Sequence, residues 1–296
     1  MRSAGFNFMI TQVQSCSLFG IDALGVDVQV DLSQGFPSFT IVGLADTAIN
    51  ESKERIRSAL KNSDITFPYT KRLVINLAPA DIRKCGPGFD LAMATGIIIS
   101  TLEISYQFSD TLFVGELGLD GRLRNMRGVL SFAIFAKEQR FRRLVLPFEN
   151  VAEAQLVSGI EYIGVKNLYE LVSFLQTGVW KPPTFLPAVK TCTPQKVVCK
   201  FDMKDVKGQT LAKRGLEIAA AGGHNILLSG PPGVGKTMLA SALPSILPNM
   251  SQQEMLEVTR IYSAAGELCP TSLIEQRPFR APHHSASSVA IVGGGQ

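Results

Sequence analysis

The sequence has few cysteines and histidines for its 296 residues, and no two of its cysteines form a CxxC pair. The five cysteines are an odd, scattered set: Cys16, Cys85, Cys192, Cys199 and Cys269. Such a set argues against a disulfide framework or a zinc site, and it is typical of a reducing compartment. We therefore expect a cytoplasmic protein.

The sequence also lacks a hydrophobic run long enough for export or membrane insertion. Near the N-terminus, Gln12, Gln14 and Ser15 interrupt the apolar core that a signal peptide would need. The most apolar stretch, LAMATGIIISTL at residues 91–102, is too short to span a bilayer. We interpret it as a buried helix, and we expect no export and no membrane partner.

Charge of either sign is not in large excess. The chain has 29 basic and 25 acidic residues, which give a net charge of +4. This balance permits contact with nucleic acid but does not by itself argue for it, so partners have to be inferred from local motifs. Apolar residues are abundant: at 46% of the sequence they are sufficient for packed cores. The length suits about two domains.

A proline-rich stretch, KPPTFLPAVKTCTPQK at residues 181–196, divides the chain. Its prolines forbid a regular helix and favour an extended, semi-rigid linker. We therefore predict a first domain over residues 1–180, a linker over 181–200 and a second domain over 201–296.

Before the linker, short apolar runs alternate with helical patterns, which predicts a mixed α and β domain. The runs expected to form strands are SFTIV (38–42), RLVINL (72–77), TLFVG (111–115) and RRLVLP (142–147). One helix is expected to start at Asp46, a good N-cap residue. Its apolar face would carry Ile49, Ile56, Ala59 and Leu60.

The second domain begins with a helical pattern, VKGQTLAKRGLEIAAAGG, that should end at Gly222 and Gly223. We expect Leu211, Leu216, Ile218 and Ala219 to form its apolar side. The next stretch, HNILLSG, contains the continuous apolar run 226–228, which predicts a strand buried on both faces of a parallel sheet.

The motif GPPGVGKT at residues 230–237 matches the phosphate-binding P-loop, GxxxxGK[ST]. Gly230, Gly233 and Gly235 allow the backbone to curl so that successive N–H groups form an anion nest. Lys236 supplies a cation for the β and γ phosphates, and the Thr237 hydroxyl can ligand Mg²⁺. The spelling PPGVGKT is closer to AAA+ ATPases than to small GTPases. The sequence therefore predicts binding of ATP and Mg²⁺ by Gly230, Pro231, Pro232, Gly233, Val234, Gly235, Lys236, Thr237 and Met238, with Thr237 as metal ligand.

The carboxylate that ATP hydrolysis requires is not apparent. Phosphoryl transfer in P-loop proteins uses an acid at the end of a neighbouring strand to hold Mg²⁺. No aspartate follows Thr237, and none of the four glutamates there comes after an apolar strand: Glu254, Glu257, Glu267 and Glu275. The last stretch, SSVAIVGGGQ, allows a strand but carries no acid. We therefore assign no catalytic residue and expect an AAA+ module that is cut short before its Walker B strand.

Several long stretches together resemble the magnesium-chelatase-like AAA+ family of the ComM and YifB type. They are VGLADTAINESKERIRSALKNSDITFP, VINLAPADIRK, GFDLAMATGI, EIAAAGGHNILLSGPPGVGKTMLA and RPFRAPHH. The resemblance implies a bacterial protein that is a homo-hexameric ring when full length and performs ATP-driven work on DNA. That work would be helicase and branch-migration activity in natural transformation or recombination.

The first domain also resembles the proteolytic domain of the Lon family, which has a ribosomal S5 domain 2-like α+β fold. The matching stretches are KCGPGFDLAMATG, FVGELGLDGRLRNMRGVL and LVLPFEN. In this comparison the nucleophilic serine position falls on Gly88 and the lysine position on Leu130, so the Ser–Lys dyad is missing. We expect a non-proteolytic domain, and Cys85 is better explained as an ordinary turn cysteine than as a substitute nucleophile.

Some features remain open between two explanations. Residues 122–143 are rich in arginine and lysine, which suits either a phosphate-contacting patch or solvated surface. The family resemblance implies a loop at the ring interface or pore for the pair His283–His284, in preference to a metal site. The stretch DVKGQ, residues 205–209, is a candidate contact for the adenine side. A nucleotide-binding module without hydrolysis, an ATP-dependent protease and a metal-chelatase ATPase are the alternative functions.

Overall fold

The computed structural model describes residues 10–44, 46–81, 84, 86–105, 108–180, 201–267, 273–283 and 285–293. The chain forms two compact units. Unit 1 comprises residues 1–191 together with 259–272, and unit 2 comprises residues 192–258 together with 273–296. The predicted linker, residues 181–200, lies outside the described residues, so the predicted domain limits stay a prediction.

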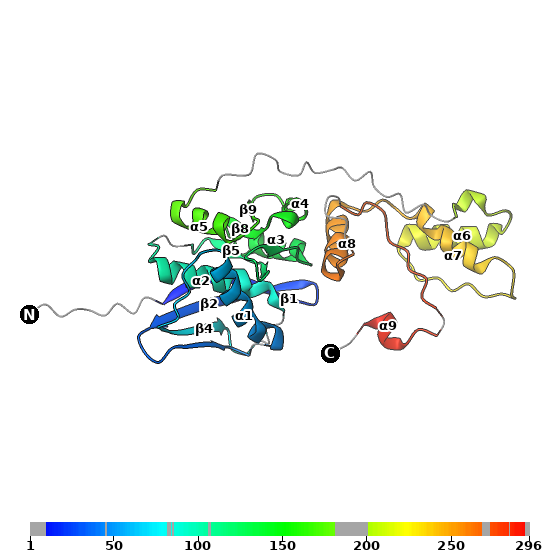
Figure 1. Ribbon diagram of the computed structural model, residues 1–296. Coiled ribbons are helices and arrows are strands. Elements are labelled where there is room, and N and C mark those ends of the chain that lie inside the picture. The colour runs from blue at the N-terminus through cyan, green and yellow to red at the C-terminus, as the bar shows by residue number, and fades with distance from the viewer. Residues whose placement is uncertain are drawn as a thin grey trace, which may run out of the picture. The chain divides into compact units, whose positions relative to one another are not determined.

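Unit 1 is built on a seven-stranded mixed sheet with the strand order β3-β4-β2-β1-β5-β8-β9 (Figure 1). Strands β1–β2 and β2–β4 pair antiparallel, and the remaining neighbours pair parallel. The strands are β1 Thr11–Phe19, β2 Asp22–Ser33, β3 Ser38–Val42, β4 Arg72–Ala78, β5 Thr111–Phe113, β8 Arg143–Pro147 and β9 Glu161–Val165, with a separate short hairpin of β6 Glu116–Leu117 and β7 Leu123–Arg124.

Helices cover both faces of this sheet. The helices are α1 Thr47–Asn62, α2 Asp90–Leu102, α3 Val129–Glu138, α4 Val151–Ala154 and α5 Leu168–Thr177. A Cβ on Gly96 of α2 would lie 2.4 Å from Val30 Cγ2, whereas a Cβ on Gly25 would lie 3.0 Å from the Phe135 ring of α3. Since Gly25 and Val30 are an odd number of residues apart on β2, they face opposite sides. Helices α2 and α3 therefore pack on opposite faces.

The predicted elements of unit 1 are confirmed. Strands β3, β4, β5 and β8 lie in the predicted runs, although β5 ends at Phe113 rather than Gly115, and the apolar stretch at 91–102 lies in the buried helix α2. Asp46 caps α1, because its Oδ1 accepts a hydrogen bond of 2.9 Å from the Ile49 N–H. Ile49, Ile56, Ala59 and Leu60 are all fully buried, as the helical spacing predicts.

Unit 2 is helical over its described residues. It contains α6 Thr210–Gly222, α7 Lys236–Ala242, the start of α8 Gln252–Ala265, and α9 Ser288–Val292, with short 3₁₀ turns at Met203–Asp205 and Leu243–Ile246. A small core holds α6 and α7 together through Met203, Val206, Leu216, Leu239 and Ala242. No helix in the described parts of the chain is both long and apolar enough to cross a membrane.

Three predictions for unit 2 are wrong. Residues 226–228 form no strand, and Leu227 is 91% exposed. A strand of a parallel sheet needs a hydrogen-bonded neighbour, and the described residues of unit 2 contain no other strand. The apolar side predicted for α6 is also only partly buried, since Leu211 and Ile218 face solvent. Finally, residues 288–292 form helix α9 where a strand was considered.

Candidate nucleotide-binding site

The P-loop is a glycine-dependent turn that leads directly into α7. Gly233 and Gly235 have φ angles of 84° and 89°, a region that glycine enters without the steric cost that a side chain imposes. No atom lies within 4 Å of a Cβ built on either residue. Their conformation, rather than lack of space, therefore explains why both positions are glycine.

Lys236 is the first residue of α7, and its ammonium group folds back over the loop. The Nζ atom donates hydrogen bonds to the carbonyl oxygens of Gly230 at 2.8 Å and Pro231 at 2.7 Å. An ammonium group has three N–H donors. Two of them hold the loop closed, and the third is available for a phosphate oxygen.

Of the other residues predicted to bind nucleotide, some are exposed to solvent and some pack against the core of unit 2. Thr237 is exposed in the first turn of α7, while Met238 packs against the core of unit 2. Leu239 and Ala242, which are buried, anchor the helix behind the loop. The loop residues Pro231, Pro232 and Val234 are exposed. The arrangement leaves the Thr237 hydroxyl free to approach a metal ion while α7 is fixed from behind.

Gln209 supports the loop from the start of α6. Its side-chain Nε2 donates a hydrogen bond of 3.0 Å to the Val234 carbonyl oxygen, and its own φ of 55° is a left-handed conformation. Gln209, the last residue of the stretch DVKGQ, therefore contacts the P-loop, whereas the predicted contact of the stretch with adenine stays a prediction. The sequence pattern did not indicate that Gln209 would brace the loop, because a side-chain contact to a backbone carbonyl leaves no periodic signal.

The Glu254 side chain caps the start of α8. Its carboxylate accepts hydrogen bonds of 2.8 Å from the Ser251 N–H and from Arg277 Nη2. The Ser251 N–H and the Arg277 guanidinium hold the pKa of this carboxyl below its usual value. A carboxylate with these partners is a capping group rather than a metal ligand.

The basic stretch at 122–143 is not a single surface patch. Arg143 is buried in β8, where its Nη2 lies 2.6 Å from Asp110 Oδ1. The inclusion of Arg143 among candidate phosphate contacts is therefore wrong, because a buried guanidinium needs an internal partner. Arg122 is exposed and lies 3.6 Å from Asp120.

The positions predicted to correspond to a protease dyad, Gly88 and Leu130, carry no reactive group. Leu130 is fully buried in α3, and a Cβ on Gly88 would lie 3.0 Å from Met126 Cε. Cys85 and His284 lie outside the described residues. The other histidine of the pair, His283, makes a 2.7 Å hydrogen bond between its Nδ1 and Ser285 Oγ. Within the described ranges, no group of three His, Cys, Asp or Glu residues could hold a metal ion.

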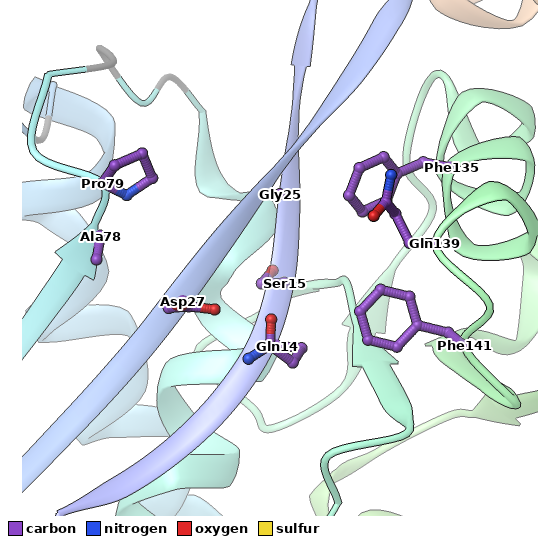
Figure 2. A pocket seen from close by; sticks show the side chains of 9 residues that line it. All are labelled: Gln14, Ser15, Gly25, Asp27, Ala78, Pro79, Phe135, Gln139 and Phe141. Carbon is purple, nitrogen blue, oxygen red and sulfur yellow. The ribbon is translucent and has the colours of Figure 1, made fainter.

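A separate hollow of about 290 Å³ lies in unit 1, on the α3 side of the sheet (Figure 2). Gln14 of β1 and Asp27 of β2 lie on the strands, and Phe135 and Phe141 face them from α3 and the turn that follows it. Ala78 and Pro79, which line the hollow, belong to the stretch VINLAPADIRK, but none of the residues predicted to bind nucleotide lies there. It is open and partly polar, unlike the mostly apolar pockets that bind small molecules.

Two family models match the chain, one in each part. The model described as subunit ChlI of Mg-chelatase matches residues 28–150. The model described as magnesium chelatase, subunit ChlI, matches residues 202–296 and so includes the P-loop.

Curated relatives match almost the whole chain. It is 43% identical over 288 residues to the competence protein ComM of Haemophilus influenzae, covering 96% of this chain and 55% of that protein. It is 42% identical over 283 residues to an uncharacterized protein of Mycobacterium tuberculosis, covering 95% and 55%. It is 39% identical over 284 residues to YifB of Escherichia coli, covering 96% and 55%. The chain thus spans about half the length of these relatives, and it belongs to the magnesium-chelatase-like family that includes ComM and YifB.

Proposed function

We propose that the chain binds Mg·ATP through residues 230–238 and that the longer protein uses this site in an ATP-driven DNA motor. The observation that carries the proposal is the P-loop itself, in which Gly233 and Gly235 have positive φ and the Lys236 ammonium lies over the loop carbonyls. The motor would work in the cytoplasm as a homo-hexameric ring, with helicase or branch-migration activity in natural transformation or recombination.

The loop residues fit a triphosphate by their donor chemistry. The backbone N–H groups at the start of α7 offer hydrogen bonds to phosphate oxygens, as helix N-termini in P-loops do. Lys236 adds a full positive charge beside them, and the Thr237 hydroxyl is the ligand that this motif contributes to a magnesium ion. When bound, Mg²⁺ neutralises phosphate charge. The chain's own part is to hold and orient the phosphates.

Unit 1 is proposed to be a Lon-like, non-proteolytic domain of the ribosomal S5 domain 2-like type that organises or contacts substrate. Its mixed sheet with helices on both faces suits an α/β domain of this size. A proteolytic role is opposed by Gly88 and the buried Leu130, which supply neither a nucleophile nor a base. DNA as a partner is proposed from the family, because ComM is named a competence protein.

A nucleotide-binding module without hydrolysis is the second candidate. No aspartate follows Thr237 in the sequence, and Glu254 is held by Ser251 and Arg277. Hydrolysis would need a carboxylate near the bound metal ion. In this second proposal the chain by itself would bind ATP but turn it over slowly or not at all.

ATP turnover separates the two candidates. We would measure phosphate release by the chain, and by a chain extended to the length of its relatives, with and without single-stranded or branched DNA. DNA-stimulated turnover that is lost in Lys236→Ala supports the motor. ATP binding without turnover in both chains supports the binding module. Equal turnover by the wild type and Lys236→Ala would contradict both, because both assign the phosphates to this loop.

A further inference from the structure

The hollow on the α3 side of unit 1 combines one carboxylate with two amide side chains and two aromatic rings (Figure 2). We call it the Asp27 hollow, and the side chains that can contact a ligand there are Gln14, Asp27, Phe135, Gln139 and Phe141. The carboxylate is the only charged group among the described residues that line it. The hollow therefore offers a ligand negative charge and amide oxygens, but no positive charge.

The strand register brings the polar side chains together. Gln14 of β1 lies directly opposite Asp27 of β2 in the antiparallel pair, so both side chains point to the same face of the sheet. Asp27 is half-buried, and a partly buried charge attracts a cation more strongly than a charge in bulk water does. Within the described ranges, no basic side chain pairs with the Asp27 carboxylate. Its negative charge is therefore available to a cation from outside the hollow.

The aromatic rings lie beside this carboxylate. A Cβ built on Gly25 would lie 3.0 Å from Phe135 Cζ, so the Phe135 ring covers β2 at Gly25. Asp27 is two residues further along the same face, about 7 Å away. The centroid of the Phe141 ring lies 6.4 Å from that of Phe135. Both phenylalanines are half-buried, so part of each ring remains accessible to a ligand.

Unit 1 already holds one of its own arginines with the same chemistry. The Arg143 Cζ lies 6.0 Å from the centroid of the Phe174 ring, and its Nη2 lies 2.6 Å from Asp110 Oδ1. A guanidinium group is planar, stacks on aromatic rings and offers five N–H donors to carboxylate and amide oxygens. An ammonium group has no plane that can stack. The two rings and the two glutamines of the Asp27 hollow therefore favour arginine over lysine.

We propose that the Asp27 hollow binds the side chain of an arginine on a protein partner. At about 290 Å³ the hollow is at the small end of ligand sites, which suits one side chain better than a whole cofactor. Because the hollow is open, the main chain of the partner can remain outside it. The guanidinium group would lie against the two rings and donate hydrogen bonds to Asp27 and to the glutamine side-chain oxygens. This inference does not depend on nucleotide binding at the P-loop.

NMR titration of the full chain with a blocked tripeptide, N-acetyl-Gly-Arg-Gly-amide, tests the site. The amide resonances of Gly25 and Asp27 should shift with one saturable affinity. A peptide with citrulline in place of arginine has nearly the same shape but no charge, and it should bind at least about tenfold more weakly. A lysine peptide should bind about threefold more weakly than the arginine peptide. No saturable shift, or an equal affinity for the citrulline or the lysine peptide, would overturn the proposal.

Variants assign the binding to parts of the hollow. Asp27→Asn keeps the shape and should weaken binding of the arginine peptide by about tenfold, whereas Phe141→Leu removes a ring and should weaken it by about threefold. Asp31→Asn is the matched control, because Asp31 is a half-buried carboxylate on the same strand and face but does not line the hollow. Equal effects of Asp27→Asn and Asp31→Asn would contradict binding in the hollow. Tighter binding of putrescine, a free diamine, than of the arginine peptide would indicate a site for a small cation and would also overturn the proposal.

Discussion

At the scale of single residues, the proposed phosphate site depends on few side chains. Gly233 and Gly235 provide the backbone conformation, and Lys236 holds the loop by its two carbonyl contacts. These three identities could be predicted from the sequence, because the chemistry restricts each position to one residue type. The contact of Gln209 with Val234 could not, since many polar residues would satisfy a lone carbonyl oxygen.

Arg143 and Asp110 allow a prediction at the same scale. The hydrogen bonds from Arg143 and Thr111 hold the pKa of Asp110 below its usual value, although partial burial acts in the opposite direction. A carboxyl whose pKa is lower in the folded state stabilises the fold above its unfolded pKa, and this contribution is lost as the pH falls through the folded pKa. Asp110→Asn should therefore lower the free energy of unfolding by about 1–2 kcal/mol at pH 7, and by less at pH 3.

Urea denaturation of the wild type and Asp110→Asn at both pH values measures this difference. Glu54 on α1 is exposed and pairs with the half-buried Arg57 at 2.9 Å, so Glu54→Gln offers a control variant with a much smaller effect. An equal loss at pH 3 and pH 7 would show that the Asp110 charge does not stabilise the fold.

At the scale of elements, the cap of α1 carries the next prediction. One oxygen of Asp46 accepts from the Ile49 N–H at 2.9 Å, and the other accepts from the Gly86 N–H at 3.0 Å. Asp46→Ala removes both contacts and should lower the free energy of unfolding by about 1–2 kcal/mol. Asp46→Asn keeps an oxygen for the Ile49 N–H, so thermal unfolding should place it between the wild type and Asp46→Ala. A melting temperature for Asp46→Ala equal to the wild type would contradict the cap.

Elements were predictable where their stabilising contacts are local. Helix α1 follows from its cap and from the spacing of Ile49, Ile56 and Leu60, which are neighbours within one helix. The run at 226–228 was misassigned because a strand depends on a partner strand, which its own residues do not encode. The second half of α8, which belongs to unit 1, could not be predicted for another reason. Its buried residues Thr259 and Ser263 are polar, so they give no apolar periodicity.

At the scale of the whole molecule, the family and the length of the chain limit which functions can be proposed for it. The chain matches ChlI-type models in both of its parts and spans 55% of ComM and YifB. The proposed ring motor would be a property of the longer protein, whereas the proposed phosphate binding requires only the P-loop and the core behind α7. Nucleotide binding is therefore the claim that an experiment on this chain can test directly.

Calorimetric titration of the chain with ATP, with and without Mg²⁺, tests that claim. We predict saturable ATP binding that depends on magnesium. The affinity should fall by about tenfold or more in Lys236→Ala, because a charged hydrogen-bond donor to phosphate is lost. Lys204→Ala, which removes an exposed lysine paired with Asp202, should bind as the wild type does. No ATP binding, or the same affinity in Lys236→Ala as in the wild type, would contradict nucleotide binding at the P-loop.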